Sequence, residues 1–217
     1  MGECINPLAS IPKVKRDVAS RRADKSPDVV AIAKQFGQEY FDGDRKYGYG
    51  GYKYDGRWQQ VALDIRAYYG LFDFQRVLDV GCAKGFLVAD FWESASLMGF
   101  GVDISDYALK RCPDSVVGYV HRASADDLPF PDESFDLVVS IDTIHNLPRE
   151  RAKRALQEIM RVSRGRAFVK VDAYWTEAER RRMEDWIITA EFWGHVDEWL
   201  ALFEEAGYVG DYAWTTI

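Results

Sequence analysis

Strand-like and helix-like segments alternate along the chain from Arg76 onward, and this alternation restricts the fold more than any other feature. Short runs rich in β-branched and apolar residues predict strands at 76–80, 99–103, 116–121, 135–141 and 166–172. Helical patterns lie between them, at about 85–97, 106–111 and 149–163. Such alternation is typical of a parallel sheet covered by helices. We therefore predict an α/β fold, Rossmann-like and doubly wound, with a mostly parallel seven-stranded sheet.

The segments on either side of this core carry further elements. After the fifth strand we expect a helix at 177–186, a strand at 188–193, a helix that ends at Gly207, and a final strand in YVGDYAWTTI. Helical patterns also run from Val29 to Phe41 and from Trp58 to Tyr69. Residues 1–27 hold three prolines and a basic run, which predicts a mobile arm or a loosely docked helix. We divide the chain into an N-terminal arm and lid segment, 1–57, and a ligand-binding domain, 58–217.

Composition and charge exclude several classes of protein. With 217 residues, 47% of them hydrophobic, the chain can bury the core of one domain. A net charge of −7 argues against nucleic acid as a partner, because phosphate backbones are bound through clustered Lys and Arg. No window approaches 18 consecutive apolar residues, and no signal-peptide pattern is present, so we expect no membrane partner. The three cysteines have neither zinc spacing nor a disulfide framework, which predicts a cytoplasmic protein without a metal site.

The stretch VLDVGCAKGF, from Val77 to Phe86, places a carboxylate and a glycine turn at the end of the first predicted strand. In an open parallel sheet, ligands bind outside the carboxyl ends of the strands, at this kind of turn. Gly81 and Gly85 are spaced G-x-x-x-G, which differs from the G-x-G-x-x-G of dinucleotide sites. Asp103 ends the second strand 18 residues beyond Gly85, where a carboxylate can accept hydrogen bonds from both ribose hydroxyls. A nucleoside attached to a cationic amino acid therefore fits this turn better than a pyrophosphate.

Three segments in sequence, VLDVGCAKGF, GVDIS and SADDLPFPDESFDLVVSIDTIHNL, resemble the class I S-adenosylmethionine-dependent methyltransferases. The resemblance extends over roughly residues 58–217 and implies a Rossmann-like domain that binds S-adenosylmethionine as its cofactor. Upstream, DGDRKYGYGGYKYDGRW is similar to a segment of bacterial methyltransferases from small-molecule and surface-glycan gene clusters.

This resemblance implies which residues hold the methionine and ribose parts of the cofactor. Asp79 would lie near the methionine ammonium, and Asp103 would hold the ribose. Gly81 and Gly85 would border the adenosine and methionine moieties. The remaining residues expected near the cofactor in this region are Cys82, Ile104 and Ser140.

The adenine end and one cation depart from the family pattern. Ser124 occupies the position where the family often has Asp or Asn facing the adenine amino group, and Ala125 offers its backbone amide there. Asp126 and Asp127 are therefore left open as adenine contacts. Lys84 replaces a small residue and would either reach the methionine carboxylate or point to solvent.

Polar residues follow the fourth and fifth predicted strands, where a sulfonium and an acceptor would meet. We predict catalytic roles for Asp142, His145 and Asp172, with His145 as a general base because histidine exchanges protons near neutral pH. A hydrogen-bonded histidine without a catalytic role is the alternative. Asn146 and Tyr174 are expected to line the acceptor side of the pocket.

The aromatic and glycine-rich segment from Tyr40 to Trp58 has two interpretations. Its tyrosines could pack on the sheet edge, with glycines serving only as turns. Alternatively, the segment forms a lid whose tyrosine faces shelter a sulfonium and whose arginine binds a carboxylate. For the lid, the predicted residues are Tyr47, Tyr52, Tyr54 and Arg57.

Methyl transfer to an oxygen or nitrogen of a small metabolite or sugar-like acceptor is the predicted function. One alternative is a cyclase that uses the same cofactor, releasing methylthioadenosine and a cyclic amino acid. Another is a non-catalytic cofactor-binding partner. A nicotinamide dehydrogenase is disfavoured by the glycine spacing. An exposed lid could also be shared across a homodimer.

Overall fold

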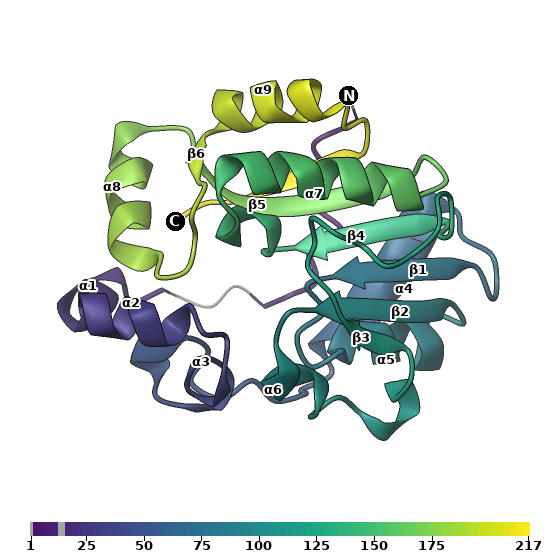
Figure 1. The fold of residues 1–217 in the computed structure, drawn as a ribbon, viewed down its shortest axis with the longest axis horizontal. Helices are drawn as coiled ribbons and strands as arrows, with labels where there is room; N and C mark the ends of the chain where they lie inside the picture. Colours follow the sequence, from purple (N-terminus) through teal and green to yellow (C-terminus); the bar gives the residue numbers. More distant parts are fainter. Residues whose placement is uncertain (1, 13–15) are drawn as a thin grey trace.

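The fold is centred on one twisted sheet in which every recorded strand pairing is parallel (Figure 1). The computed structural model describes residues 2–12 and 16–217. The strand order is β3-β2-β1-β4-β5-β6. The seventh strand, β7, lies off this path and pairs with β5. The strands are β1 (Arg76–Val80), β2 (Met98–Asp103), β3 (Val120–Arg122), β4 (Leu137–Ile141), β5 (Ala167–Tyr174), β6 (Gly194–His195) and β7 (Asp211–Thr215). The α/β, Rossmann-like fold with a seven-stranded sheet is thus confirmed.

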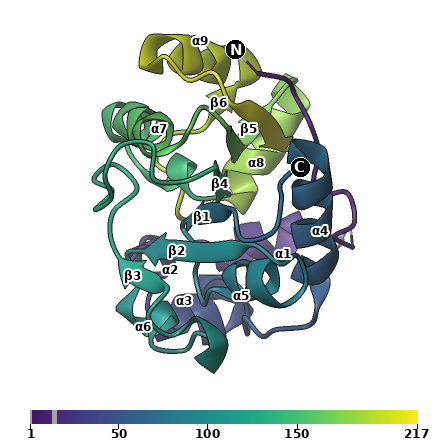
Figure 2. The same cartoon turned by 90° about the vertical axis from the view of Figure 1, so that its right-hand side faces the viewer.

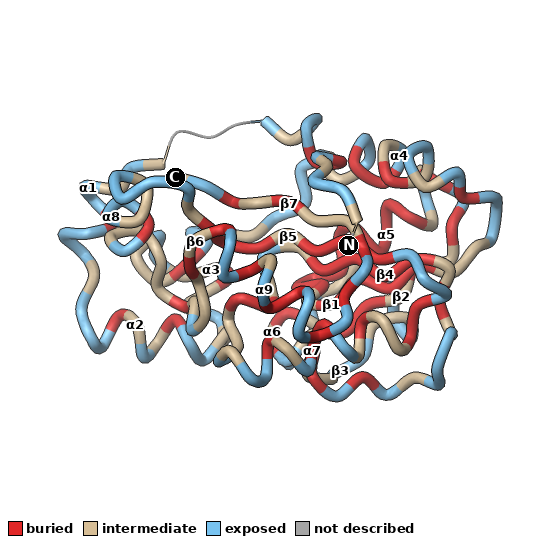
Figure 3. Tube along the Cα trace, turned by 90° about the horizontal axis from the view of Figure 1, so that it is seen from above, coloured by how far each residue is buried: buried red, intermediate tan, exposed pale blue. Residues whose placement is uncertain are grey.

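Helices cover both faces of this sheet (Figure 2). On one face, α4 (Arg57–Tyr69) and α5 (Phe86–Glu93) enclose an apolar cluster that includes Ile65, Phe91 and Val77. On the other, α7 (Arg149–Val162) and α9 (Val196–Ala206) cover a cluster that includes Leu78 and Trp199. Neighbouring β1 residues therefore point into different layers, as the pleat of a strand requires. Figure 3 shows the buried strands running through the centre of the molecule.

The N-terminal segment forms a cap beside one end of the sheet. It contains α1 (Val18–Asp24), α2 (Pro27–Ala33), α3 (Gln38–Asp42) and a 3-10 turn, η1 (Arg45–Tyr47). The helix α1 packs against α8 (Glu177–Trp186), and Lys25 Nζ donates to the carbonyl of Glu184 at 2.6 Å. At the other end of the arm, Cys4 forms a parallel bridge with Tyr212 of β7. Of the two expectations for residues 1–27, the docked helix is confirmed for α1, and residues 13–15 lie outside the described residues.

Several predicted elements differ from the observed ones. The helix expected over Val29–Phe41 is two helices, because Phe36 adopts a left-handed φ of +47° and Gly37 is the N-cap of α3. The strand expected at 116–121 begins only at Val120, after a 3-10 turn, η2 (Asp114–Val116). The helix predicted at 106–111 is shorter than expected and is observed as α6 (Asp106–Leu109).

The predicted strand at 188–193 is wrong, and its place is taken by the two residues of β6. The amides of Glu191 and Phe192 both donate to the carbonyl of His145, at 2.9 and 3.0 Å. The segment therefore bends over the end of β4 instead of joining the sheet as an extended strand. The remaining predicted helices and strands are confirmed with shifts at their ends.

Among the described residues, no helix combines the length and the apolar character needed to cross a membrane.

Candidate cofactor and acceptor site

A cavity lies at the carboxyl ends of β1, β2 and β4, and residues of the N-terminal cap form part of its lining. Its volume is about 100 Å³. Ligand pockets commonly measure about 300–1,000 Å³, so a cofactor can enter only if part of the cap moves. The lining residues are Phe36, Tyr40, Phe41, Tyr49, Gly81, Ala83, Val102, Asp103, Ile104, Ala123, Ser124, Ala125, Ile141, Asp142, Thr143, Asn146 and Leu147.

The glycine turn after β1 forms one wall of this cavity. The amides of Gly81 and Cys82 donate to the carbonyl of Val102 in β2, at 2.8 and 3.0 Å, which fixes the turn against the sheet. Gly81 has a φ of +90°, and a Cβ there would lie 2.0 Å from Thr143 Oγ1. Only glycine fits this conformation and this contact.

Four of the residues predicted to bind cofactor, Asp79 among them, are absent from the lining of the cavity, and the other three lie behind the glycine turn. Cys82 is buried, and burial raises the pKa of its thiol. Gly85 precedes α5 with a φ of +71°. Ser140 is fully buried, and its hydroxyl donates to the carbonyl of Val80. These residues hold β1, β4 and α5 in position around the site.

Asp103 organises the turn from the end of β2. Its Oδ2 accepts the amide of Ala83 and its Oδ1 accepts the amide of Ser105, each at 2.8 Å. Ala83 has a left-handed φ of +51°, which the bond to Asp103 supports. Burial raises the pKa of Asp103, and these amide bonds oppose the rise. Each carboxylate oxygen keeps a lone pair that can accept a ligand hydroxyl.

Asp79 is a buried carboxylate without a partner. Its residue is 6% exposed, and no hydrogen bond or ion pair to its side chain occurs among residues 2–12 and 16–217. Burial, with a smaller contribution from the charge of Asp103, raises the pKa of Asp79 to about 7. A buried carboxylate of this kind is stabilised by a cation.

At the opposite side of the cavity, Ser124 and Ala125 line the wall while Asp126 does not. Arg151 holds Asp126 through two hydrogen bonds of 2.7 and 2.9 Å. These bonds outweigh the effect of burial and lower the pKa of Asp126 to about 2. Asp127 is exposed. The wall at the predicted adenine end is therefore formed by Ser124 and Ala125, with neither aspartate among its lining residues.

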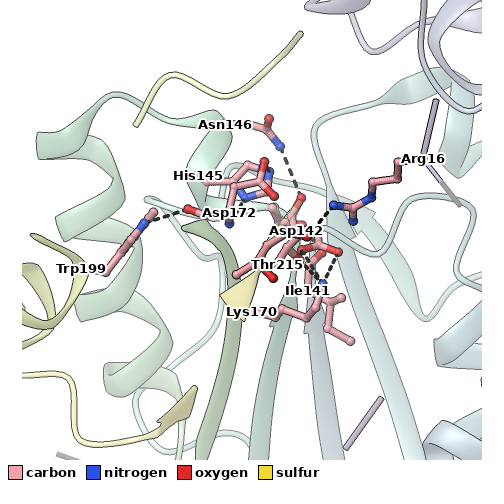
Figure 4. A network of polar contacts seen from close by, with 11 residues as sticks. Arg16, Ile141, Asp142, His145, Asn146, Lys170, Asp172, Trp199 and Thr215 are labelled. Atoms are coloured by element: carbon pink, nitrogen blue, oxygen red, sulfur yellow. Dashed lines mark hydrogen bonds and ion pairs between the residues drawn. The ribbon is translucent and has the colours of Figure 1, made fainter. Parts of the chain in front are cut away.

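Asp142, His145 and Asp172 converge where β4 and β5 end (Figure 4). Asp142 lines the cavity with a left-handed φ of +52°, a strained conformation that often occurs at functional sites. Lys170 Nζ donates to both of its oxygens, at 2.9 and 2.8 Å, and Thr215 Oγ1 donates at 2.6 Å. Burial raises the pKa of Asp142, but Lys170 and the hydrogen bonds outweigh it, so the pKa is lowered. Lys170 already supplies the positive charge that a metal ion would bring to this cluster.

His145 lies behind Asp142 and is 5% exposed. Its Nδ1 accepts the backbone amide of Asp172 at 3.0 Å, and its Nε2 lies 3.7 Å from Asp172 Oδ2. With Nδ1 used as an acceptor, the neutral ring carries its proton on Nε2, facing Asp172. Neither nitrogen is then free to take a proton from an acceptor. Burial raises the pKa of Asp172, and the neighbouring His145 opposes this rise.

The lid segment contributes different aromatic residues from those predicted. Tyr40, Phe41 and Tyr49 line the cavity, and the Phe41 and Tyr49 rings are stacked with centroids 5.8 Å apart. Tyr40 and Phe41 lie where the predicted helix over Val29–Phe41 overlaps the aromatic segment that begins at Tyr40, and neither was among the predicted lid residues. Their membership of the aromatic segment was the only sequence signal.

The residues predicted for the lid and acceptor lie in several places, and only Asn146 lines the cavity. Tyr52 packs on Phe86 behind the cavity-lining aromatic residues. Tyr54 donates to Asp90, and Arg57 is paired with Asp55 at the start of α4. The Lys46 ammonium lies 5.0 Å from the ring centroid of Tyr47, a cation–π contact. Tyr174 contacts Trp193 and His195 at the end of β5.

Lys84 neither reaches the cavity nor points to solvent, so both expectations for it are wrong. Its Nζ donates to the two carboxylate oxygens of Asp42 and to the carbonyl of Tyr52, each at 2.7 Å. Lys84 lies in the glycine turn, while Asp42 and Tyr52 belong to the cap. A buried ion pair thus connects the cofactor turn to the lid.

Lys84→Met is expected to loosen the lid without changing the sheet. It leaves Asp42 without its cation and should cost about 1–3 kcal/mol of stability, less than a fully buried pair because the Asp42 side chain is 25% exposed. Limited proteolysis should cleave the segment 43–56 faster in this variant. The double variant Lys84→Met/Asp42→Asn should lose less stability than the single one, because no uncompensated charge remains. Equal cleavage rates in wild type and Lys84→Met would contradict the connection.

Known proteins share both sequence and fold with this chain. The family profile described as "Methyltransferase domain" matches residues 78–169. A tRNA (carboxymethyluridine(34)-5-O)-methyltransferase from Arabidopsis thaliana is 30% identical over 60% of this chain and 34% of its own length. The 27-O-demethylrifamycin SV methyltransferase of Amycolatopsis mediterranei is 26% identical over 61% of this chain and 53% of its own length. The chain thus spans about a third to a half of the length of these relatives.

A solved structure of a SAM-dependent methyltransferase from Archaeoglobus fulgidus shares the fold, with a TM-score of 0.53 and 20% identity over 69% of this chain and 68% of that one. The cyclase alternative finds no support in these relatives, and the glycine turn after β1 lies inside the matched domain. The domain match and the parallel sheet agree: residues 78–169 of this chain match the methyltransferase domain family, and the chain has the fold of S-adenosylmethionine-dependent methyltransferases.

Proposed function

We propose that this chain transfers the methyl group of S-adenosylmethionine to an oxygen or nitrogen of a small metabolite or sugar-like acceptor. The observation that carries the proposal is the unpartnered, buried carboxylate of Asp79 beside the strained turn at Gly81. Burying a carboxylate is costly unless a cation or a hydrogen bond satisfies it. The methionine ammonium of the cofactor would supply that cation.

The residues that line the cavity suit the remaining parts of the cofactor. Asp103 can accept the ribose hydroxyls on the lone pairs that Ala83 and Ser105 leave free. Ile104, Ser124 and the Ala125 amide would border the adenine ring. S-adenosylmethionine supplies an activated methyl group on its sulfonium when bound.

The protein's part in the reaction is orientation and exclusion of water. Holding two reactants in line can contribute about 7–11 kcal/mol to lowering a barrier. Asp142 would accept a hydrogen bond from the acceptor's hydroxyl or amine, because it lines the cavity and its lowered pKa keeps it ionised. His145 acts as a positioning residue that fixes Asp172 and the end of β5. Tyr40 and Tyr49 would cover the sulfonium, since aromatic faces attract cations.

The finer features of the function are proposals as well. A net charge of −7 disfavours nucleic acid as the substrate and favours a small acceptor. We propose a cytoplasmic role in small-molecule biosynthesis, with residues 1–57 as arm and lid and 58–217 as the cofactor domain. A homodimer that shares the lid is also proposed.

Calorimetry with S-adenosylmethionine and S-adenosylhomocysteine tests the cofactor directly. Both are expected to bind, and mass spectrometry of reactions with an acceptor panel should detect S-adenosylhomocysteine. Release of methylthioadenosine without any acceptor would point to cyclisation instead. Failure of well-folded protein to bind either compound would refute the proposal.

The affinity for S-adenosylhomocysteine is expected to rise with pH from 5 to about 7. The pKa of Asp79 is about 7 in the free protein and 3.8 in an ordinary aspartate, so below pH 7 the folded protein holds a proton there. An ammonium ligand must displace that proton, which makes the affinity rise by up to about tenfold per pH unit until Asp79 ionises. The same raised pKa makes the free protein less stable as the pH rises from about 4 to 7.

Two controls isolate Asp79 in this measurement. Adenosine lacks the ammonium and should show a smaller rise with pH, which reports any contribution from Asp103. Asp79→Asn cannot ionise and should remove the difference between the two ligands. Identical pH slopes for adenosine and S-adenosylhomocysteine in wild-type protein would show that Asp79 does not face the ammonium.

A further inference from the structure

Three arginines surround one tryptophan where the N-terminal cap meets α8. The guanidinium carbons of Arg16, Arg21 and Arg45 lie 5.5, 5.0 and 5.3 Å from the ring centroid of Trp186. They come from three places in the sequence, just before α1, within α1 and within η1, while Trp186 ends α8. We call these four residues the arginine cluster. Figure 1 shows α1 lying beside α8.

The guanidinium groups of this cluster hydrogen-bond to carbonyl oxygens and not to carboxylates. Arg16 donates to Thr216 O at 3.0 Å, Arg21 to Lys46 O at 2.8 Å, and Arg45 to Gly48 O. Within the described residues, no carboxylate lies in ion-pair distance of any of the three. Burial and the charge of Arg45 lower the pKa of Arg21, as expected for crowded cations. Three positive charges thus converge with no carboxylate in direct ion-pair contact among the described residues, in a chain whose net charge is −7.

Two sets of hydrogen bonds connect the arginine cluster to the proposed acceptor side of the cavity. Arg45 and Arg21 both bond to the carbonyl of Gly48, which precedes Tyr49, and the Tyr49 amide donates to Tyr40 O. Both tyrosines line the cavity. On the other side, Arg16 is held at Thr216, next to Thr215, whose hydroxyl donates to Asp142. Figure 4 shows Arg16 directed toward this network from the cap.

We propose that the arginine cluster binds an oxyanion, carboxylate or phosphate, of the methyl acceptor, so that the substrate is an acidic small molecule. The inference rests on the proposed methyl transfer and adds the substrate class. Guanidinium groups match carboxylate and phosphate oxygens in geometry as well as charge. Trp186 holds the three cations together through its ring face; Arg21 is buried behind this ring, while Arg45 is exposed. Arg57, expected to bind such a carboxylate, is paired with Asp55 instead.

Binding of simple oxyanions tests the cluster before any acceptor is known. Malonate and inorganic phosphate are titrated into protein saturated with S-adenosylhomocysteine, at constant ionic strength balanced with chloride. We expect saturable binding of at least one of them by calorimetry. In Arg16→Gln and Arg45→Gln its dissociation constant should rise at least tenfold. Arg45→Lys keeps the charge and should retain part of the affinity, whereas Arg154→Gln, an exposed arginine on α7, should behave as wild type.

A panel of matched acceptors gives the second readout. Each pair consists of one hydroxyl or amine compound that carries a carboxylate or phosphate ester and its uncharged amide or alcohol analogue. We expect S-adenosylhomocysteine to form with acidic members and at least tenfold more slowly with their neutral analogues. The carboxylate and phosphate pairs distinguish the two sources of the oxyanion.

The outcomes separate this inference from the proposed function. Loss of S-adenosylhomocysteine binding in wild-type protein would refute the methyltransferase function itself. Normal cofactor binding together with no anion binding, or with equal anion binding in wild type and Arg45→Gln, would overturn the acidic acceptor. Faster transfer to the neutral analogues would overturn it too. Faster proteolysis of Arg45→Gln with unchanged anion binding would assign the cluster a purely structural role.

Discussion

Gly81→Ala is expected to reduce S-adenosylmethionine binding by about 30-fold to about 10⁴-fold, the largest loss of affinity from any single methyl group added to this chain. A non-glycine residue at a φ of +90° costs about 1–3 kcal/mol. The new Cβ would also meet Thr143 Oγ1 at 2.0 Å and Cγ2 at 2.3 Å, and overpacking of this kind adds about 1–3 kcal/mol. The turn can relieve both only by moving away from Val102, which displaces Asp79 and Ala83 from the cofactor. Calorimetry with S-adenosylmethionine measures the loss.

Gly118 provides a matched control for this substitution. It has the same φ of +90°, but a Cβ there would meet nothing within 4 Å. Gly118→Ala therefore carries the backbone cost without the collision and should leave cofactor affinity near the wild-type value. Combining Gly81→Ala with Thr143→Ala removes two of the colliding atoms and should restore part of the affinity. If Gly81→Ala and Gly118→Ala bound S-adenosylmethionine equally well, the contact with Thr143 would have no role in shaping the site.

The parts of the site that follow from local sequence were predictable. A carboxylate and two glycines at the end of a strand define a turn through backbone geometry alone, so Asp79 and Gly81 could be placed before the fold was known. The period of α7 likewise follows from apolar positions that must face one side. The strand at 188–193 was not predictable, because two amides there bond to His145, a residue more than 40 positions away in the sequence.

Contacts between distant segments also decide the roles of individual side chains. Lys84 looked like a cofactor ligand because it lies in the glycine turn, yet its partner Asp42 is 42 residues away. The aromatic segment contains several equivalent tyrosines. Tyr49 and Tyr52 both pack on Phe41, yet only Tyr49 lines the cavity, because Tyr52 is stacked on Phe86. For His145, the residue type suggested a base, but the Asp172 amide occupies the nitrogen that would act.

Asp142→Asn is expected to reduce kcat by about 10²–10⁴-fold while leaving S-adenosylmethionine affinity within about threefold of wild type. Asparagine tolerates the left-handed φ of +52° and has nearly the same shape, so the backbone at the end of β4 should remain in place. The substitution removes the negative charge that orients the acceptor's hydroxyl or amine. Lys170 then loses its ion-pair partner and keeps its hydrogen bond to Thr215. The rate is measured at saturating cofactor with the best acceptor of the panel, and thermal unfolding monitors the fold.

Variants of His145 show whether Asp142 or the histidine handles the proton. His145→Asn keeps an acceptor near the Nδ1 position and should retain most of kcat, whereas His145→Ala leaves the buried Asp172 amide unsatisfied and should cost about 1–3 kcal/mol of stability. Because the lowered pKa keeps Asp142 ionised, kcat of the wild type should show no inflection from this group between pH 5 and 8. A histidine base would instead produce an acid-side fall in kcat within this pH range. If wild-type protein shows this fall, and His145→Asn loses both the fall and most of kcat, the catalytic role belongs to His145.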